Sequence, residues 1–375
     1  MFDILLKNAI VTVWVCSRLL LLHSLPQPQT PRKRERLLVC PTSPNILCGL
    51  CLSRSSNPRF NYRLIFVQHT RIYLTTGGIP AMENGKRKEH GVPGWHTQQN
   101  FCRVVALAIV LLCLLCHGVI DMGIAVLWVW LRANPIFKHE SFEPCLSTAC
   151  FFLYIGFFGI LDFFTPCVWP YRIGTSKEVV PQYINGKRVR YAIFGYLMPL
   201  VAFDLAFPRR VLPEEAPSAR RLVLEVVGAI AVYDITFFLW HVTLHQHPKL
   251  YKKIHAKHHQ KLVQRAPESV RHTFVDGTMD VMCSIFALNV LHCHPLSRAL
   301  YDVVIIWLIT ELHAGYDFPW QVHNLLPFGL MGGPPRHDLH HRSGKVYMQK
   351  FGTYLDELFG FVPNKGLKLD NIKHQ

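Results

Sequence analysis

Charged residues are scarce in this sequence, and so are the features of a small disulfide-bonded domain. Only 17% of the 375 residues are charged, against about 25% in an average soluble protein. Hydrophobic residues make up 50%, which excludes disorder for most of the chain, because disordered segments are poor in apolar side chains. The 12 cysteines are scattered, which excludes a compact disulfide scaffold.

Several motifs of soluble enzymes are also absent. The chain has no G-x-G-x-x-G fingerprint, no P-loop and no G-x-S-x-G, so nothing indicates its own nicotinamide, flavin or nucleotide site. It has no Asn-x-Ser/Thr sequon, so nothing indicates glycosylated lumenal loops. Cys113-Leu-Leu-Cys116-His117 matches the haem-attachment pattern, but it lies inside an apolar run and we interpret it as a chance match.

The net charge of +16 could indicate a nucleic-acid partner, but its distribution does not. Residues 1–98 hold 13 Lys/Arg against 4 Asp/Glu, and the other basic residues border apolar blocks rather than forming one stripe beside exposed aromatics. Lysine and arginine commonly mark the cytosolic ends of membrane spans. We therefore expect a lipid bilayer as the partner, and no nucleic acid.

The apolar residues are gathered into long blocks, which favours a membrane protein. The backbone of a lipid-facing segment must be helical, because unsatisfied amides are costly in hydrocarbon. The sequence therefore predicts an all-α, polytopic membrane helix bundle with a cytosolic, histidine-rich cap that binds two metal ions. The expected blocks are residues 104–131, 146–169, 192–207 and 221–240, with shorter apolar pieces at 279–290 and 299–312.

The composition changes along the chain and predicts four regions. Residues 1–98 read as a poorly ordered basic leader, of which 1–81 look dispensable or foreign to the mature protein. Transmembrane helices follow in 99–240, then a histidine-box region with short membrane or interfacial helices in 241–362, and a tail in 363–375. Basic residues between Lys249 and Arg271 place the histidine-box region in the cytosol by the positive-inside rule.

Histidine is the most informative residue type. Of the 21 histidines, 14 lie between positions 241 and 341. Nine of them fall into an HxxxH box, two HxxHH boxes and one isolated position after an apolar helix: His241, His245, His255, His258, His259, His313, His337, His340 and His341.

This spacing predicts a binuclear metal site. Residues i, i+3 and i+4 share one face of a helix, so each box presents its imidazoles together. One zinc ion takes three or four protein ligands, and nine imidazoles exceed that number. They suit two metals with open positions for dioxygen or water, and neutral imidazole binds Fe, Zn, Cu and Ni alike. The other histidines of this region read as structural; the role of His272 is open.

The boxes resemble the fatty acid hydroxylase/sterol desaturase superfamily of membrane di-iron enzymes, and within it the sterol side-chain hydroxylases. The resemblance covers residues 100–362, is weak before Pro170, and is carried by His241–His245, LYKKIHAKHHQ, CHPL, HAGYDFPW, PFGLMGG and HDLHH. It implies that the nine box histidines are the ligands of two iron ions. It further implies O2 as co-substrate, electrons from NADPH through partner reductases, and the endoplasmic reticulum membrane.

The resemblance implies hydroxylation of a sterol, with Tyr316, Phe318 and Trp320 as candidate walls of the substrate site. These three could equally be interfacial aromatics. Two other functions stay open: a C4-methylsterol or fatty acyl hydroxylase or desaturase, and an inactive relative or structural zinc protein. Arg336, His272 and residues 342–347 depart from the family pattern, which bears on the substrate more than on the chemistry.

Overall fold

The computed structural model describes residues 92–173, 186–208, 210–260 and 264–363. All of them lie in the compact unit Thr76–Gln375. Within these residues the chain is helical and its only β pairing is two isolated bridges, so the all-α prediction is confirmed. Most of the expected leader, 1–91, and all but the first residue of the expected tail, 364–375, lie outside the described residues.

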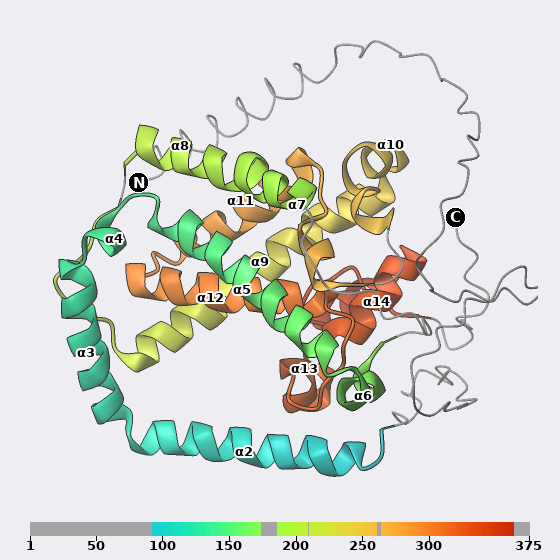
Figure 1. Ribbon diagram of the computed structural model, residues 1–375, viewed down its shortest axis with the longest axis horizontal. Helices are drawn as coiled ribbons and strands as arrows, with labels where there is room; N and C mark the ends of the chain where they lie inside the picture. The colour runs from blue at the N-terminus through green and yellow to red at the C-terminus, as the bar shows by residue number, and fades with distance from the viewer. Residues whose placement is uncertain (1–91, 174–185, 209, 261–263, 364–375) are drawn as a thin grey trace, which may run out of the picture. The chain divides into compact units, whose positions relative to one another are not determined.

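Figure 1 shows the helices in chain order. The longer ones are α2 (Trp95–Leu115), α3 (His117–Ala133), α5 (Phe142–Phe163), α8 (Met198–Ala206), α9 (Ala219–Gln246), α11 (Phe274–Val290), α12 (Pro295–His313) and α14 (Gly333–Ser343). Shorter elements connect them: α4 (Pro135–Lys138), α6 (Thr165–Val168), η1 (Trp169–Tyr171), α7 (Gly186–Arg190), η2 (Tyr191–Leu197), α10 (Pro248–Leu250), η3 (Tyr251–His255), η4 (His258–Gln260), η5 (Ala266–Val270), α13 (Val322–Leu325), η6 (Pro327–Gly329) and α15 (Tyr354–Phe359).

Three of the described helices are long and apolar enough to cross a membrane: Trp95–Leu115, Phe142–Asp162 and Ala219–Gln246. The apolar stretch of the first of these is not buried in the protein at all, as expected for a helix that faces lipid. The segment Tyr191–Ala206 is apolar but shorter. The chain is therefore a membrane protein with several candidate spans.

The first apolar block is not the continuous span that residues 104–131 predict. It divides into α2 and α3, which meet at Cys116 and run in different directions (Figure 1). The Nδ1 atom of His117 lies 3.1 Å from the carbonyl oxygen of Leu114. A side chain that hydrogen-bonds a carbonyl of the last turn competes with the next helical hydrogen bond and helps to end a helix.

The main core lies between α9, α11 and α12. The buried positions of α9 recur every three or four residues, including Ala229, Tyr233, Phe237 and His241, which is the spacing of one helix face. Tyr233 and Phe237 pack in one apolar cluster with residues of α11 and α12 such as Tyr301. The apolar face of α9 therefore continues directly into the first histidine box.

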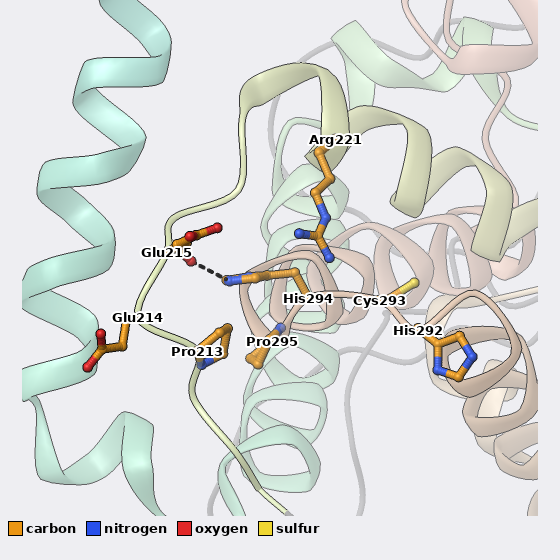
Figure 2. Close-up of a pocket in the computed structure, with 8 residues that line it drawn as sticks. All are labelled: Pro213, Glu214, Glu215, Arg221, His292, Cys293, His294 and Pro295. Atoms are coloured by element: carbon orange, nitrogen blue, oxygen red, sulfur yellow. Dashed lines mark hydrogen bonds between the residues drawn. The ribbon is translucent and has the colours of Figure 1, made fainter. Parts of the chain in front are cut away.

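A pocket of about 410 Å³ lies away from the histidine boxes, beside the start of α9 and the turn between α11 and α12. Figure 2 shows Arg221 and His294 lining it, with the ring of His294 directed at the backbone oxygen of Glu215. The two atoms are 3.2 Å apart, and the other ring nitrogen of His294 accepts the N–H of Leu296. Both ring nitrogens of His294 are thus engaged within the protein.

Candidate metal centre

The nine predicted histidines converge into two groups, and no other described residue joins either group. The first cluster contains five imidazoles: His241, His245, His255, His259 and His340. The second cluster contains four: His258, His313, His337 and His341. In each cluster one ring nitrogen from every histidine lies within 4.8 Å of the others.

The first cluster draws on three parts of the chain. The last turns of α9 supply His241 and His245, because i and i+4 lie on one face of a helix. The η3–η4 segment supplies His255 and His259, and α14 supplies His340. The Nε2 atom of His241 lies 3.1 Å from the Nε2 atoms of both His245 and His255, and the His255 and His259 Nε2 atoms are also 3.1 Å apart.

In several rings of the first cluster, the Nδ1 atom forms a hydrogen bond with an acceptor outside the cluster. The Nδ1–H of His241 donates to the carbonyl of Met348 at 2.7 Å, and that of His340 donates to the carbonyl of Val346 at 2.8 Å. Because a carbonyl can only accept, Nδ1 carries the proton in each neutral ring and Nε2 presents a bare lone pair. The buried Nε2 atom of His340 has no protein partner.

The ring of His255, also in the first cluster, forms its Nδ1 hydrogen bond with a carboxylate. The Nδ1–H of His255 donates to the Oδ2 of Asp276 at 2.8 Å, and both side chains are only 2% exposed. Burial opposes ionisation of Asp276, but the hydrogen bond from His255 and the neighbouring His272 hold its pKa below the ordinary value. A carboxylate behind a histidine fixes the ring and raises its basicity as a ligand. Sequence spacing did not identify Asp276, because it lies on α11, far from every box.

The second cluster is buried throughout. The Nε2 atom of His337 lies 3.0 Å from those of His313 and His341, and His313 and His258 are 3.4 Å apart at the same atoms. The Nδ1–H of His313 donates to the carbonyl of Ile309 at 2.8 Å, one turn back on α12. Its Nε2 atom therefore also presents a lone pair to its neighbours.

Burial keeps these rings neutral. Burial first, and then the charges of neighbouring histidines, hold the pKa of His258, His337 and His341 well below the ordinary value. Burial likewise lowers the pKa of His313 and His340 to about 3. Neutral imidazole is the form that binds a metal ion.

Both clusters fit metal ions. Facing lone pairs repel one another unless a cation lies between them, and the separations of 3.0–3.4 Å are those of adjacent nitrogens around one ion at about 2.1 Å. Five donors exceed the four of a closed tetrahedral zinc site, which favours a six-coordinate ion with an open position at the first cluster. A six-coordinate ion in the second cluster would have two positions left for other ligands.

The two clusters are neighbours. His258 and His259 are adjacent in sequence and enter different clusters, and so do His340 and His341. The rings of His259 and His341 stack at 4.6 Å between centroids. His272, which the boxes left unassigned, joins neither cluster, but its ring lies 4.5 Å from that of His258.

The three aromatic residues after His313 form a stack. The rings of Tyr316 and Phe318 lie 5.2 Å apart, and Phe318 and Trp320 are 5.2 Å apart and nearly parallel. Tyr316 and Phe318 are buried in an apolar cluster with α5, and the Tyr316 hydroxyl donates to Asp162. Trp320 is 38% exposed. A small cavity of about 10 Å³ includes Glu311 and His323 in its lining.

Comparisons with known proteins identify relatives of this chain. The family model for fatty acid hydroxylase matches residues 226–361, which include all nine histidines. The chain is 31% identical to cholesterol 25-hydroxylase of Homo sapiens over 267 residues, covering 65% of this chain and 96% of that protein. It is 33% identical to cholesterol 25-hydroxylase-like protein 2 of Danio rerio over 257 residues, covering 62% and 87%.

A more distant relative has another named substrate. The chain is 30% identical over 211 residues to a putative methylsterol monooxygenase of Dictyostelium discoideum, covering 52% of this chain and 74% of that protein. No solved structure matches the chain.

Proposed function

Because this chain belongs to the fatty acid hydroxylase family, we propose that it is a membrane monooxygenase that hydroxylates a sterol, as cholesterol 25-hydroxylase does. The observation that carries the proposal is the convergence of nine histidines into neighbouring clusters of five and four. A sterol is the proposed substrate because the names of the relatives include cholesterol. In this proposal the two clusters hold the metal ions that carry out the oxidation.

The proposed cofactors are two iron ions, one in each cluster, with O2 as co-substrate. Dioxygen, one C–H bond, two electrons and two protons give an alcohol and one water. The electrons come from NADPH through a reductase and membrane electron-transfer proteins, since the sequence has no nucleotide or flavin motif. The proposed location is the endoplasmic reticulum membrane, with the histidine boxes facing the cytosol as the basic residues after α9 favour.

The residues of the chain have separable tasks in this proposal. All nine box histidines, in both clusters, act as ligands, and the carbonyl and carboxylate acceptors behind His241, His255 and His340 fix each ring with Nε2 forward. When bound, the iron ions supply the activation of O2 and the one-electron chemistry that breaks an unactivated C–H bond. Burial of the second cluster excludes water. Tyr316, Phe318 and Trp320 form one side of the lipid site.

The regional division of the chain is part of the same proposal. Residues 99–240 anchor the protein in the bilayer, residues 241–362 carry the metal centre, and residues 1–81 are dispensable for turnover. Expression of residues 82–375 alone should preserve the activity of the full chain. Loss of activity in the shorter chain, with equal membrane insertion, would contradict this division.

The decisive test is product analysis. Cells expressing the chain and supplied with cholesterol should accumulate one new hydroxylated sterol, and the purified protein should contain about two iron ions per chain. The methylsterol monooxygenase among the relatives favours a second candidate, oxidation of a C4-methylsterol. In that case methylsterols would disappear and no new oxysterol would form. Zinc without reductant-dependent O2 uptake would instead indicate a structural site and contradict both candidates.

A further inference from the structure

The segment after the last histidine box, residues 346–352, runs along α9 and is called the strap here. Its carbonyls accept from two ligands of the first cluster. Met348 accepts from His241 on α9 at 2.7 Å, and Val346 accepts from His340 on α14 at 2.8 Å. The position of one short segment therefore sets the orientation of two imidazoles that come from different helices.

Asp234 holds the strap against α9. This residue lies two turns before His241 on the same helix and is 3% exposed. Its Oδ1 accepts the backbone N–H of Phe351 at 2.9 Å. Its Oδ2 accepts the backbone N–H of Gly352 at 2.8 Å and the side-chain amide of Gln349 at 2.7 Å. All three donors belong to the strap.

The fit between Asp234 and the strap leaves no free space. A Cβ atom added at Gly352 would lie 3.0 Å from the Oδ2 of Asp234 and 2.4 Å from the Nε2 of Gln349. Lys350 gives the strap a second attachment, since its Nζ lies 3.1 Å from both carboxylate oxygens of Asp280. Glycine at 352 thus permits the close approach on which the carboxylate contacts depend.

We propose that Asp234 is a positioning residue for the first cluster, acting through the strap on His241 and His340. This inference depends on the proposed function, because it assumes that the clusters bind metal ions. Among the hydrogen bonds of the described residues, none joins the strap to the second cluster, whose His313 is tied to Ile309 on its own helix. The loss of Asp234 should therefore weaken one metal site and spare the other.

The test is the iron content of purified full-length protein, measured per chain beside the thermal midpoint of the apoprotein. Removal of a group that orients a metal-bound histidine costs about 10- to 100-fold in metal affinity. Asp234→Ala should lower the content from two ions towards one at limiting free iron, and Asp234→Asn should fall between. Gly352→Ala displaces the strap while Asp234 itself is kept, and it should give the same selective loss, which keeps the test valid if Asp234→Ala does not fold.

Glu225→Gln is the matched control. Glu225 is also an acid on α9 that accepts a backbone N–H, that of His294 at 2.8 Å, but it lies at the far end of the helix. Its substitution should leave two ions per chain. Two tightly bound ions in both Asp234→Ala and Gly352→Ala, or equal loss from both clusters, would overturn the inference. A wild-type protein that binds no iron would instead refute the proposed function.

Discussion

The two histidine clusters differ in what holds their rings in place. In the first cluster, acceptors outside the helical segment that carries each ring fix three rings: the strap for His241 and His340, and Asp276 for His255. In the second cluster, His313 is fixed by its own helix, and the buried Nδ1 atoms of His258 and His341 have no protein partner. The first cluster therefore depends on tertiary structure around it, and the second on local helix geometry and burial.

The largest expected effect comes from removing a ligand. His340→Ala should lower sterol hydroxylation by about a thousandfold, because a metal supplies several kcal/mol of transition-state stabilisation. Product formation in membranes with equal protein content measures it. His247→Ala is the control, since this exposed histidine lies two residues after His245 and joins neither cluster. Normal turnover in His340→Ala would remove this residue from the ligand set.

The stability of the apoprotein should fall in acid. Burial holds the pKa of His258, His337 and His341 below the ordinary value, so below about pH 6.5 the unfolded chain binds protons that the folded chain does not. Stability is therefore complete above pH 6.5 and is lost as the pH falls, by about 1.4 kcal/mol per histidine for the first pH unit. The thermal midpoint at pH 7.5 and 5.5 measures this. A shallower dependence in His341→Gln would locate part of it in the second cluster.

An intermediate effect is expected for the carboxylate behind His255. Asp276→Asn removes the charge that the His255 Nδ1–H meets at 2.8 Å, and the affinity of the first cluster for iron should fall about 10- to 100-fold. Asp338→Asn removes an equal charge that instead pairs with Arg342, and it should leave both sites filled. Iron titration of the apoprotein compares the two variants. Equal binding in both would show that tertiary support is unimportant for the first cluster.

The smallest effect is expected at the edge of the aromatic stack. Trp320→Ala removes a partly exposed ring that stacks on Phe318, and the loss of about 1–2 kcal/mol of apolar contact should raise KM for the sterol about tenfold. The kcat should change less, because the ring contacts no metal ligand in this proposal. Steady-state kinetics separate the two constants. A fall in kcat alone would assign Trp320 to another role.

Much of the site could be predicted from the sequence, because box spacing is a local property. The HxxxH and HxxHH patterns gave eight of the nine members of the two clusters, and the isolated His313 is the ninth, since helical periodicity brings i and i+4 together. Their division into five and four could not be predicted, because it depends on how α9, α12 and α14 pack. Asp276, Val346 and Met348 could not be predicted either, because their contacts with the histidines depend on the fold. Val346 and Met348 also act through backbone carbonyls, which any residue would offer.

The fold was predicted in outline. Apolar length identified the helices of the bundle, but not the break at Cys116, because a hydropathy pattern does not register a single histidine that bonds a carbonyl of the preceding turn. The helices α11 and α12 begin four or five residues before the apolar pieces 279–290 and 299–312 from which they were predicted. Thr273 and His294, polar residues that cap those helices, set where they begin.

Two pairs of consecutive residues, His258–His259 and His340–His341, each send one ring to either cluster. Consecutive Cα atoms are held about 3.8 Å apart by covalent geometry. In the proposed site, one peptide unit on η4 and another on α14 would each link a ligand of one metal ion to a ligand of the other. The separation of the two ions would therefore depend on covalent backbone geometry at two points of the chain.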